Sequence, residues 1–205
     1  MYYICYSGND HTNQQQKGAA MIRESVVGDV PRIDTTAYVD PAAVIIGRVI
    51  IGPNCYIGPG VVIRADRFSN DDDIASITIG SGCCIQDLAV LHVHAENSIA
   101  IGDDAVINHG AIIHGTTSIG RNCFIGAKSV ITHASLGDRV FTRVMSVIET
   151  VNIASERYIE INTVINTQDA ADRLRPITTK EKEFMERAVM ENREYAVRYK
   201  YSLEK

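Results

Sequence analysis

The fold is decided by residues 101–135, which read IGDDAV INHGAI IHGTTS IGRNCF IGAKSV ITHAS. An aliphatic residue opens each group of six, and a small or β-branched residue stands four positions later. A period of six differs from the alternation of an ordinary strand and from the helical period of about 3.6 residues. It is the signature of the hexapeptide repeat, which places one short strand in each hexad. With three hexads per turn, the pattern predicts a triangular solenoid whose successive coils pair as parallel strands.

The same spacing continues upstream of residue 101, with two interruptions. Aliphatic residues recur at Val39, Ile45, Ile51, Ile57, Ile63, Ile79, Ile85 and Leu91. We expect these side chains to stack in the interior of an all-β solenoid, one above the other. The two interruptions, Arg67–Ser76 and His94–Ala100, are expected to be loops that bulge from it. After Ser135 the register loosens.

The position after each aliphatic residue is expected to turn a corner. Glycine fills this position at residues 52, 58, 80, 102, 120 and 126. Glycine suits a corner because it permits backbone conformations that other residues disfavour. In other hexads the same position holds Arg64, Gln86, His92, Asn108 and His114, which are all capable of site chemistry.

The segments on either side of the solenoid, which we assign to residues 21–176, differ in character. Residues 1–20 are polar and show no repeat, so we expect a poorly ordered N-terminal extension. Pro176 followed by Thr178-x-x-Glu181 has the pattern of a capping box and predicts a helix of about Thr179–Leu203. We expect this C-terminal segment, 177–205, to pack along the solenoid through Phe184, Ala188 and Tyr195.

Composition narrows the classes of partner and compartment. A net charge of −5, without a run of lysine or arginine, argues against nucleic acid or an anionic membrane as the main partner. No apolar stretch has the length of a membrane span, and Met1–Gly8 lacks the regions of a secretory signal. We therefore expect a cytoplasmic protein with a small substrate. The five cysteines have no CxxC spacing, and we interpret Cys55, Cys83 and Cys123 as small core residues.

Counting coils brings polar residues together. Residues three hexads apart are neighbours on one edge, so Arg64, His92 and His114 should form one column. On the next edge, Gln86 should lie under Asn108 and Asp87 under His109. Two imidazoles about 4.8 Å apart can converge on one metal ion.

Within one chain, His109 cannot easily reach the column of His92 and His114. A neighbouring subunit must then supply the third ligand, and we expect a homotrimer in which each Asp87/His109 edge meets the next subunit's histidine column. We interpret the other histidines, His11, His94 and His133, as structural or merely exposed.

Three segments resemble the γ-class carbonic anhydrases in order and spacing: Arg64-Ala-Asp66, Ile85-Gln-Asp-Leu-Ala-Val-Leu-His92 and His109-Gly-Ala-Ile-Ile-His114-Gly115. Tyr158–Val164 and Thr167–Leu174 look like the closing coils of that family, and the resemblance covers most of Val30–Leu174. It implies a left-handed parallel β-helix, because hexapeptide-repeat proteins wind in that hand.

The resemblance also implies roles for individual residues. His92, His109 and His114 would bind Zn²⁺, with Fe²⁺ or Co²⁺ as alternatives. Gln86 would steady the metal-bound solvent, and Arg64 and Asp66 would pair at the subunit interface near the site. With Asp87 beside His109, these residues make up the expected catalytic set.

The implied activity is the reversible hydration of CO2 to bicarbonate by a metal-bound hydroxide. Well-known active members of the family have glutamates where this chain has Arg67 and Ala95. Glu96 or the Asp71–Asp73 loop would then have to transfer the proton to solvent. Two other functions stay open. One is a hexapeptide-repeat acyltransferase that uses CoA or another acyl donor with a histidine base, and the other is a catalytically weak metal-binding scaffold.

Overall fold

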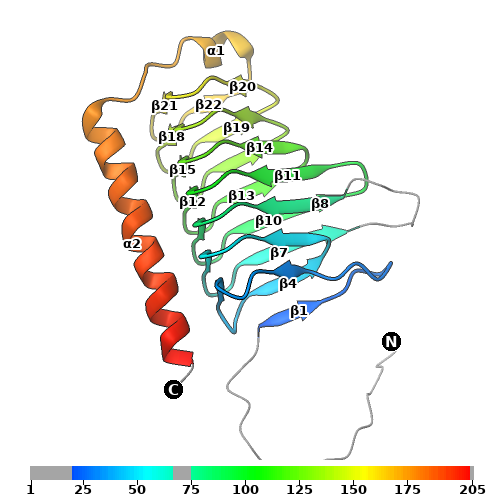
Figure 1. Cartoon of the computed structure of the whole chain (residues 1–205). Helices are drawn as coiled ribbons and strands as arrows, with labels where there is room; N and C mark the ends of the chain where they lie inside the picture. Colours follow the sequence, from blue (N-terminus) through cyan, green and yellow to red (C-terminus); the bar gives the residue numbers. More distant parts are fainter. Residues whose placement is uncertain (1–19, 67–74, 204–205) are drawn as a thin grey trace, which may run out of the picture.

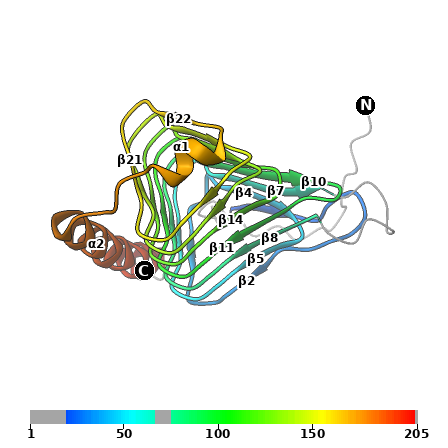
Figure 2. The same cartoon turned by 90° about the horizontal axis from the view of Figure 1, so that it is seen from above.

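The computed structural model describes residues 20–66 and 75–203. This part of the chain winds into a left-handed parallel β-helix, and a long C-terminal helix returns along its side (Figure 1). Seen along the axis, three flat sheets enclose a triangular cross-section (Figure 2). The predicted all-β solenoid with a C-terminal helix is confirmed. The predicted N-terminal extension lies, except for Ala20, outside the described residues.

The three sheets, here called A, B and C, each take one strand from every coil in the described part of the chain. Sheet A orders its strands as β1 (Met21–Arg23), β4 (Val44–Gly47), β7 (Val62–Asp66), β10 (Val90–His94), β13 (Ile112–His114), β16 (Val130–Thr132), β19 (Val147–Glu149) and β22 (Val164–Ile165). Sheet B orders them as β2 (Arg32–Ile33), β5 (Val49–Ile51), β8 (Ser76–Ile79), β11 (Ser98–Ile101), β14 (Thr117–Ile119), β17 (Ser135–Leu136) and β20 (Asn152–Ile153). Sheet C contains β3 (Tyr38–Val39), β6 (Tyr56–Ile57), β9 (Cys84–Ile85), β12 (Val106–Ile107), β15 (Phe124–Ile125), β18 (Phe141–Thr142) and β21 (Tyr158–Ile159).

Coil length explains the change of register after Ser135. Ile101 pairs with Ile119, 18 residues later, whereas Ile119 pairs with Leu136, 17 residues later. Leu136 pairs in turn with Ile153, again 17 residues later. The passage from sheet A to sheet B has lost one residue in these coils, so the solenoid continues while the period of six fails.

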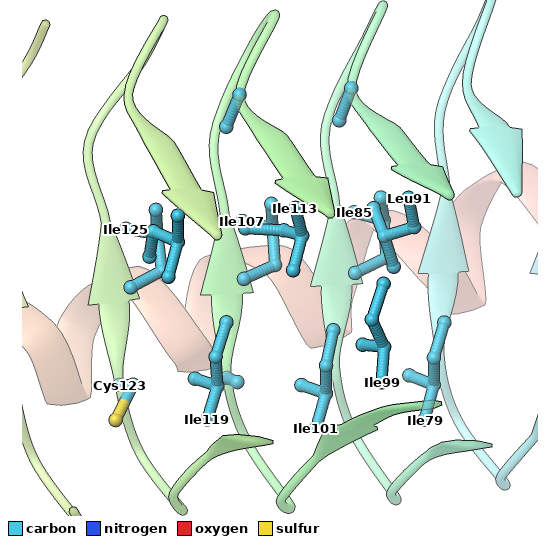
Figure 3. Packing of buried hydrophobic residues seen from close by; sticks show 14 of the residues in the cluster. Ile79, Ile85, Leu91, Ile99, Ile101, Ile107, Ile113, Ile119, Cys123 and Ile125 are labelled. Carbon is cyan, nitrogen blue, oxygen red and sulfur yellow. The ribbon is translucent and has the colours of Figure 1, made fainter. Parts of the chain in front are cut away.

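Stacked aliphatic side chains form the core (Figure 3). Ile107, Ile113 and Ile125 are fully buried, as are most of their counterparts in the other coils. Replacing one such isoleucine by alanine is expected to cost about 2–5 kcal/mol, because neighbouring coils cannot collapse into the space.

The glycines after the aliphatic residues have a different physical reason from the expected one. A Cβ atom added to Gly102 would lie 2.8 Å from the Arg121 nitrogen, and one added to Gly120 would lie 2.5 Å from the Gly137 carbonyl carbon. Neither glycine has a left-handed backbone. Glycine is needed here because adjacent coils approach closely.

The inward cysteines act as small core residues that satisfy backbone groups. The thiol of Cys83 donates to the Gly102 carbonyl (3.1 Å), and that of Cys123 donates to the Gly137 carbonyl (3.1 Å). Burial raises the pKa of Cys123 to about 12, which keeps its proton in place for this bond. Each thiol therefore links its own coil to the next.

The C-terminal end of the solenoid carries a short helix, α1 (Gln168–Asp172), in a segment that was predicted to continue the coils. The predicted capping box opens α2 (Thr179–Leu203): the Thr178 N–H donates to Glu181 Oε2 (2.6 Å), and the Glu181 N–H lies 3.4 Å from Thr178 Oγ1.

The buried face of α2 is offset from the expected one. Met185, Val189, Asn192 and Ala196 are buried against sheet C, whereas Phe184 and Tyr195 are exposed and lie at the margins of the contact. The apolar pattern of this helix is too weak to fix the phase of its packing.

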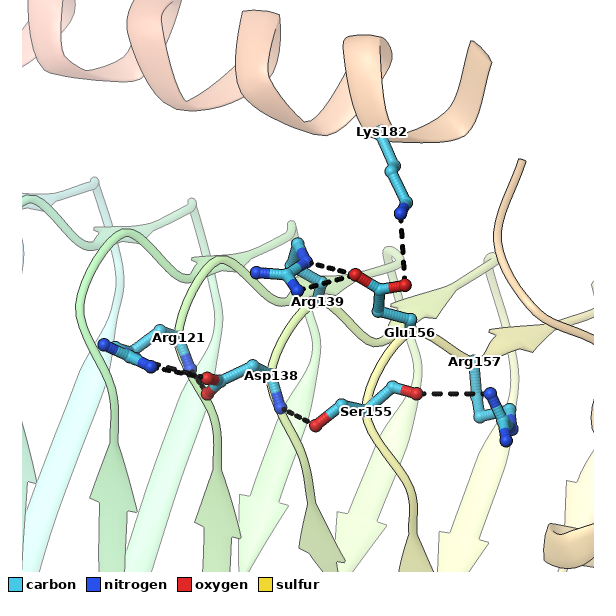
Figure 4. Close-up of polar contacts among 7 residues, drawn as sticks. All are labelled: Arg121, Asp138, Arg139, Ser155, Glu156, Arg157 and Lys182. Carbon is cyan, nitrogen blue, oxygen red and sulfur yellow. Dashed lines mark hydrogen bonds and ion pairs between the residues drawn. The ribbon is translucent and has the colours of Figure 1, made fainter. Parts of the chain in front are cut away.

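Ion pairs follow the corner between sheets B and C (Figure 4). Arg121 pairs with Asp138 on the next coil (2.8 Å), and Arg139 pairs with Glu156 (2.6 Å). Lys182 of α2 also reaches Glu156 (3.1 Å), which ties the helix to this corner. Exposed pairs of this kind contribute at most about 1 kcal/mol each.

Candidate metal centre

Two histidines lie in register on the outer face of sheet A. Side chains alternate along a strand, so His92 points outward while Leu91 and Val93 are buried in the core. The strand register places Arg64, His92 and His114 side by side on β7, β10 and β13, as the coil count predicts. The ring centroids of His92 and His114 are 5.4 Å apart.

These residues stand within strands, or at a strand end, and not at corners. Strands β7 and β10 run for five residues each, to Asp66 and His94, before the loops that interrupt the repeat. The extra strand length holds Arg64 and His92 on a flat, hydrogen-bonded surface. The expectation that these two positions turn a corner was therefore wrong.

His92 carries a buried nitrogen with no hydrogen-bond partner in the described residues. Its Nε2 atom lies 3.5 Å from Asp66 Oδ2, beyond hydrogen-bond range for aligned groups. Asp66 also forms an ion pair with Arg64, two residues earlier on the same strand. Burying a ring nitrogen without a hydrogen-bond partner costs free energy of desolvation. This atom is therefore a candidate metal ligand.

Two more histidines, His94 and His133, lie beside this pair, and both are exposed, in line with our interpretation of them as structural or merely exposed. The His94 ring lies 5.9 Å from that of His92 and 6.1 Å from that of His114, and the His133 ring lies 6.4 Å from that of His114. The signal for His94 was present in the sequence, because residues two apart on a strand share a face. His133 packs over Gly115, where an added Cβ would lie 2.5 Å from its ring.

The surroundings favour the neutral form of His114. Partial burial lowers its pKa, and the nearby imidazoles of His92, His94 and His133 lower it further. A neutral imidazole is the form that binds a metal ion.

The other predicted edge lies where sheet C passes into sheet A. His109 follows β12, and its Nδ1 atom lies 3.6 Å from Asp87 Oδ2 on the preceding coil. The Gly110 N–H donates to the Asp87 carbonyl (2.9 Å), which fixes the two coils in register. Both side chains are exposed to solvent, so this edge is open to a partner.

Gln86 is held by the C-terminal helix. Its Nε2 atom donates to Asn192 Oδ1 (2.8 Å) and lies 3.2 Å from Cys84 Sγ. Asn192 is buried between α2 and sheet C. Asn192 was not among the predicted site residues, because no local pattern reveals which helical residue faces a strand residue 106 positions away.

The predicted site residues thus fall on two edges of one chain. Across the described residues, no three His, Cys, Asp or Glu side chains of a single chain are placed to hold a metal ion. Ala95 lies in the left-handed region (φ 49°) at the turn after β10, and Glu96 beside it is exposed. Arg67 and the Asp71–Asp73 loop lie outside the described residues.

A ladder of outward aliphatic side chains runs along sheet A beside the histidines. Its members pair directly from coil to coil: Val44, Val62, Val90, Ile112, Val130, Val147 and Val164. We call this set the aliphatic ladder. Ile112 is 41% exposed and Val164 is 59% exposed, and the corner beside them adds Leu88, which is 67% exposed. Apolar surfaces of this kind are typical of interaction sites.

Leu88 stands at a turn of the solenoid that requires a left-handed backbone. Its φ of 60° lies in the left-handed region, which disfavours a bulky residue. The preceding coil has Gly60 at this place, and the Leu88 side chain lies across it. The same left-handed turn recurs in other coils, at Asp104, Asn122 and Lys128, so this backbone conformation belongs to the fold. The feature that favours a contact is the exposure of an apolar side chain at this turn.

No helix in the described part of the chain is long and apolar enough to span a membrane.

Comparison with known proteins supports the class of repeat. The bacterial transferase hexapeptide family, whose model contains six repeats, matches residues 24–65 and 98–133. These two segments of the chain therefore carry the hexapeptide repeat.

Relatives of this chain include two named proteins. The carboxysome assembly protein CcmM of Nostoc sp. is 32% identical over 163 residues, which cover 75% of this chain and 28% of CcmM. The carnitine operon protein CaiE of Escherichia coli is 35% identical over 123 residues, which cover 60% of this chain and 59% of CaiE. The chain therefore matches only part of the length of either relative.

A solved hexapeptide transferase family protein from Anaplasma phagocytophilum has the same fold, with a TM-score of 0.73. It is 24% identical, and the match covers 87% of this chain and 98% of that protein.

Proposed function

We propose that this protein hydrates CO2 reversibly to bicarbonate at a zinc site of the γ-class carbonic anhydrase type, shared between subunits of a homotrimer. The observation that carries the proposal is the pair of His92 and His114, in register on neighbouring strands. The buried Nε2 atom of His92 has no hydrogen-bond partner among the residues that the structure describes. His109 of the next subunit would complete the ligand set. Three imidazoles suit Zn²⁺, with Fe²⁺ and Co²⁺ as alternatives.

The trimer is required because one chain separates its ligands onto two edges. The aliphatic ladder and Leu88 lie between those edges and offer apolar surface to a second copy. In a closed ring, each Asp87/His109 edge would meet a neighbour's histidine column and leave no unpaired surface. Burial of the ladder would also exclude water from the neighbourhood of the site.

With His92, His114 and a neighbour's His109 as neutral ligands, a bound Zn²⁺ would act as a Lewis acid and would lower the pKa of a coordinated water molecule to about 7. The protein's own residues prepare this site. Asp66, paired with Arg64, lies 3.5 Å from the Nε2 atom of His92 and adds negative charge beside the site. Gln86, held by Asn192, would present its amide to solvent and substrate at the His109 edge, and Asp87 would orient His109 through Nδ1.

Two other functions have specific support. The family model and the solved relative are both named for transferases, which favours an acyltransferase with a histidine base. The relative CcmM is a carboxysome assembly protein, and Arg67 and Ala95 replace glutamates of active family members, which favours a metal-binding scaffold with little turnover.

One anaerobically purified sample of the full chain separates the three functions. Metal content, CO2 hydration by stopped flow and consumption of acetyl-CoA with a panel of acceptors would be measured together. Metal with hydration supports the proposal, and metal without turnover indicates a scaffold. Acetyl transfer by a metal-free sample that does not hydrate CO2 would overturn it.

A further inference from the structure

We propose that a cavity between α2 and sheet C binds a small organic carboxylate with an aromatic body. The cavity has a volume of about 400 Å³ and lies between the first two turns of α2 and strands β15 and β18. This volume is in the range of small-molecule sites, which are typically apolar with a few polar groups. The inference is independent of the metal site.

Three phenylalanine rings form the apolar walls of the cavity. The centroid of Phe124 lies 5.0 Å from that of Phe141 and 5.2 Å from that of Phe184, with the rings edge to face. Phe141 and Phe184 are stacked at 5.6 Å. Although it belongs to this cluster, Phe184 remains 42% exposed, so part of its ring is available to a ligand. An aromatic ligand would add one more ring to an existing set of such contacts.

The charged groups that line the cavity are biased toward binding an anion. Arg143 and Lys180 both line it, and neither forms an ion pair with a carboxylate among the described residues. The Arg143 Nη1 atom donates to the Tyr158 hydroxyl (3.2 Å), which holds the guanidinium in place.

The one acidic side chain in the lining, Glu181, is already engaged. It accepts from Arg175 Nη2 (2.6 Å) and from the Thr178 N–H (2.6 Å). Its charge is therefore compensated, and the two remaining cations are left to face the ligand. A carboxylate satisfies them, whereas a purely apolar molecule does not.

Binding of phenylbutyrate to the full-length protein tests the proposal by isothermal titration calorimetry. We expect one saturable site per chain. Arg143→Gln and Lys180→Gln should each weaken binding about three- to fivefold, as expected for the loss of one partly exposed ion pair. Phe184→Leu should weaken it further, because the exposed ring is lost. Arg187→Gln, which removes one exposed arginine from the same helix but away from the cavity, should leave binding unchanged.

Uncharged phenylbutanol distinguishes recognition of the carboxylate from recognition of the aromatic ring. It should bind more weakly than phenylbutyrate to the unmodified protein, and Lys180→Gln should not weaken it. Absence of saturable phenylbutyrate binding overturns the proposal, as does equal loss in Lys180→Gln and Arg187→Gln. Circular dichroism would show whether Phe184→Leu disturbs the packing of α2. In that case Arg143→Gln and Lys180→Gln still test the proposal, because both side chains are exposed.

Discussion

His92 and His114 are Cα partners on neighbouring parallel strands, and their imidazole centroids lie 5.4 Å apart on the outside of the solenoid. Neither side chain contributes to the stacked core. Two imidazoles at this spacing can share one metal ion held about 2.0–2.1 Å from each nitrogen. Substitution of either histidine therefore tests metal binding directly.

Replacing His92 by alanine should remove bound metal and CO2 hydration together. The trimer should persist, because the aliphatic ladder is unchanged. Thr132 is the matched control, since it pairs with His114 on the other side of the column, and Thr132→Ala should keep both metal and activity. Elemental analysis and stopped-flow assays check these outcomes. Unchanged metal in the His92 variant would show that the ligands are assigned wrongly.

Gln86→Ala should retain metal while slowing hydration about 10- to 100-fold, because Gln86 acts on solvent and not on the ion. Asn192→Ala should slow it less, since it removes only the group that holds the Gln86 amide. The two effects should be non-additive in the double variant, because the second substitution finds the contact already broken. Loss of metal from Gln86→Ala would contradict the assigned role.

Ile112→Glu should dissociate the trimer and release metal without unfolding the solenoid. The substitution places a charge in the middle of the aliphatic ladder, two residues before His114. Ile50→Glu is the control, because Ile50 is similarly exposed (43% against 41%) but lies on sheet B. Sizing chromatography with light scattering, together with circular dichroism, checks the outcome. If the Ile112→Glu protein stayed trimeric and kept its metal, the aliphatic ladder would not be part of the interface.

The contact between Arg175 and Glu181 should make stability depend on pH. The Arg175 guanidinium, with further hydrogen bonds from Thr178, lowers the pKa of Glu181 from 4.5 to about 2. Its contribution to stability is therefore fully present above about pH 4.5 and is lost as pH falls toward 2.

Glu181→Gln should consequently lower Tm by a few degrees at pH 7, by an amount that shrinks as pH falls through this window. Glutamine still serves the capping box, so the variant isolates the charge. Glu183→Gln, an exposed neighbour on the same helix, is the control for loss of one charge. A Tm difference that stays constant from pH 7 to pH 3 would assign the effect to something other than this ionisation.

The sequence predicted the fold because each hexad is a local signal and each coil has a nearly fixed length. Coil arithmetic then placed His92 beside His114, and Asp87 under His109, as the strand register shows. Coil counting failed after Ser135, where the coil is one residue shorter. No local pattern in the sequence shows that the chain loses a residue between sheets A and B. The extension of β10 to His94 was missed for a similar reason.

Other features depend on packing between distant segments and were not accessible from the sequence. The phase of α2 on sheet C decides that Asn192 faces Gln86, whereas the helix's own pattern pointed to Phe184 and Tyr195. That His92 Nε2 is buried without a hydrogen-bond partner in the described part of the chain is likewise a property of the packed site. Both require the folded geometry.

The assignment of ligands across the subunit interface predicts rescue in mixed trimers. One subunit type would carry His109→Ala with His92 and His114 intact, and the other would carry His92→Ala and His114→Ala with His109 retained. Homotrimers of either type lack a ligand at every interface, so neither should be active. In a mixed ring, one interface joins an intact column to an intact His109.

Unfolding the two types together and refolding them should therefore restore one complete site per mixed trimer. The expected result is about one metal ion and about a third of the normal activity, if the three sites act independently. Native mass spectrometry would confirm the subunit composition and count the metal ions. If mixed trimers formed and no metal returned, His109 would not be the ligand that a neighbour supplies, because this mixture differs from the inactive homotrimers only in that one interface.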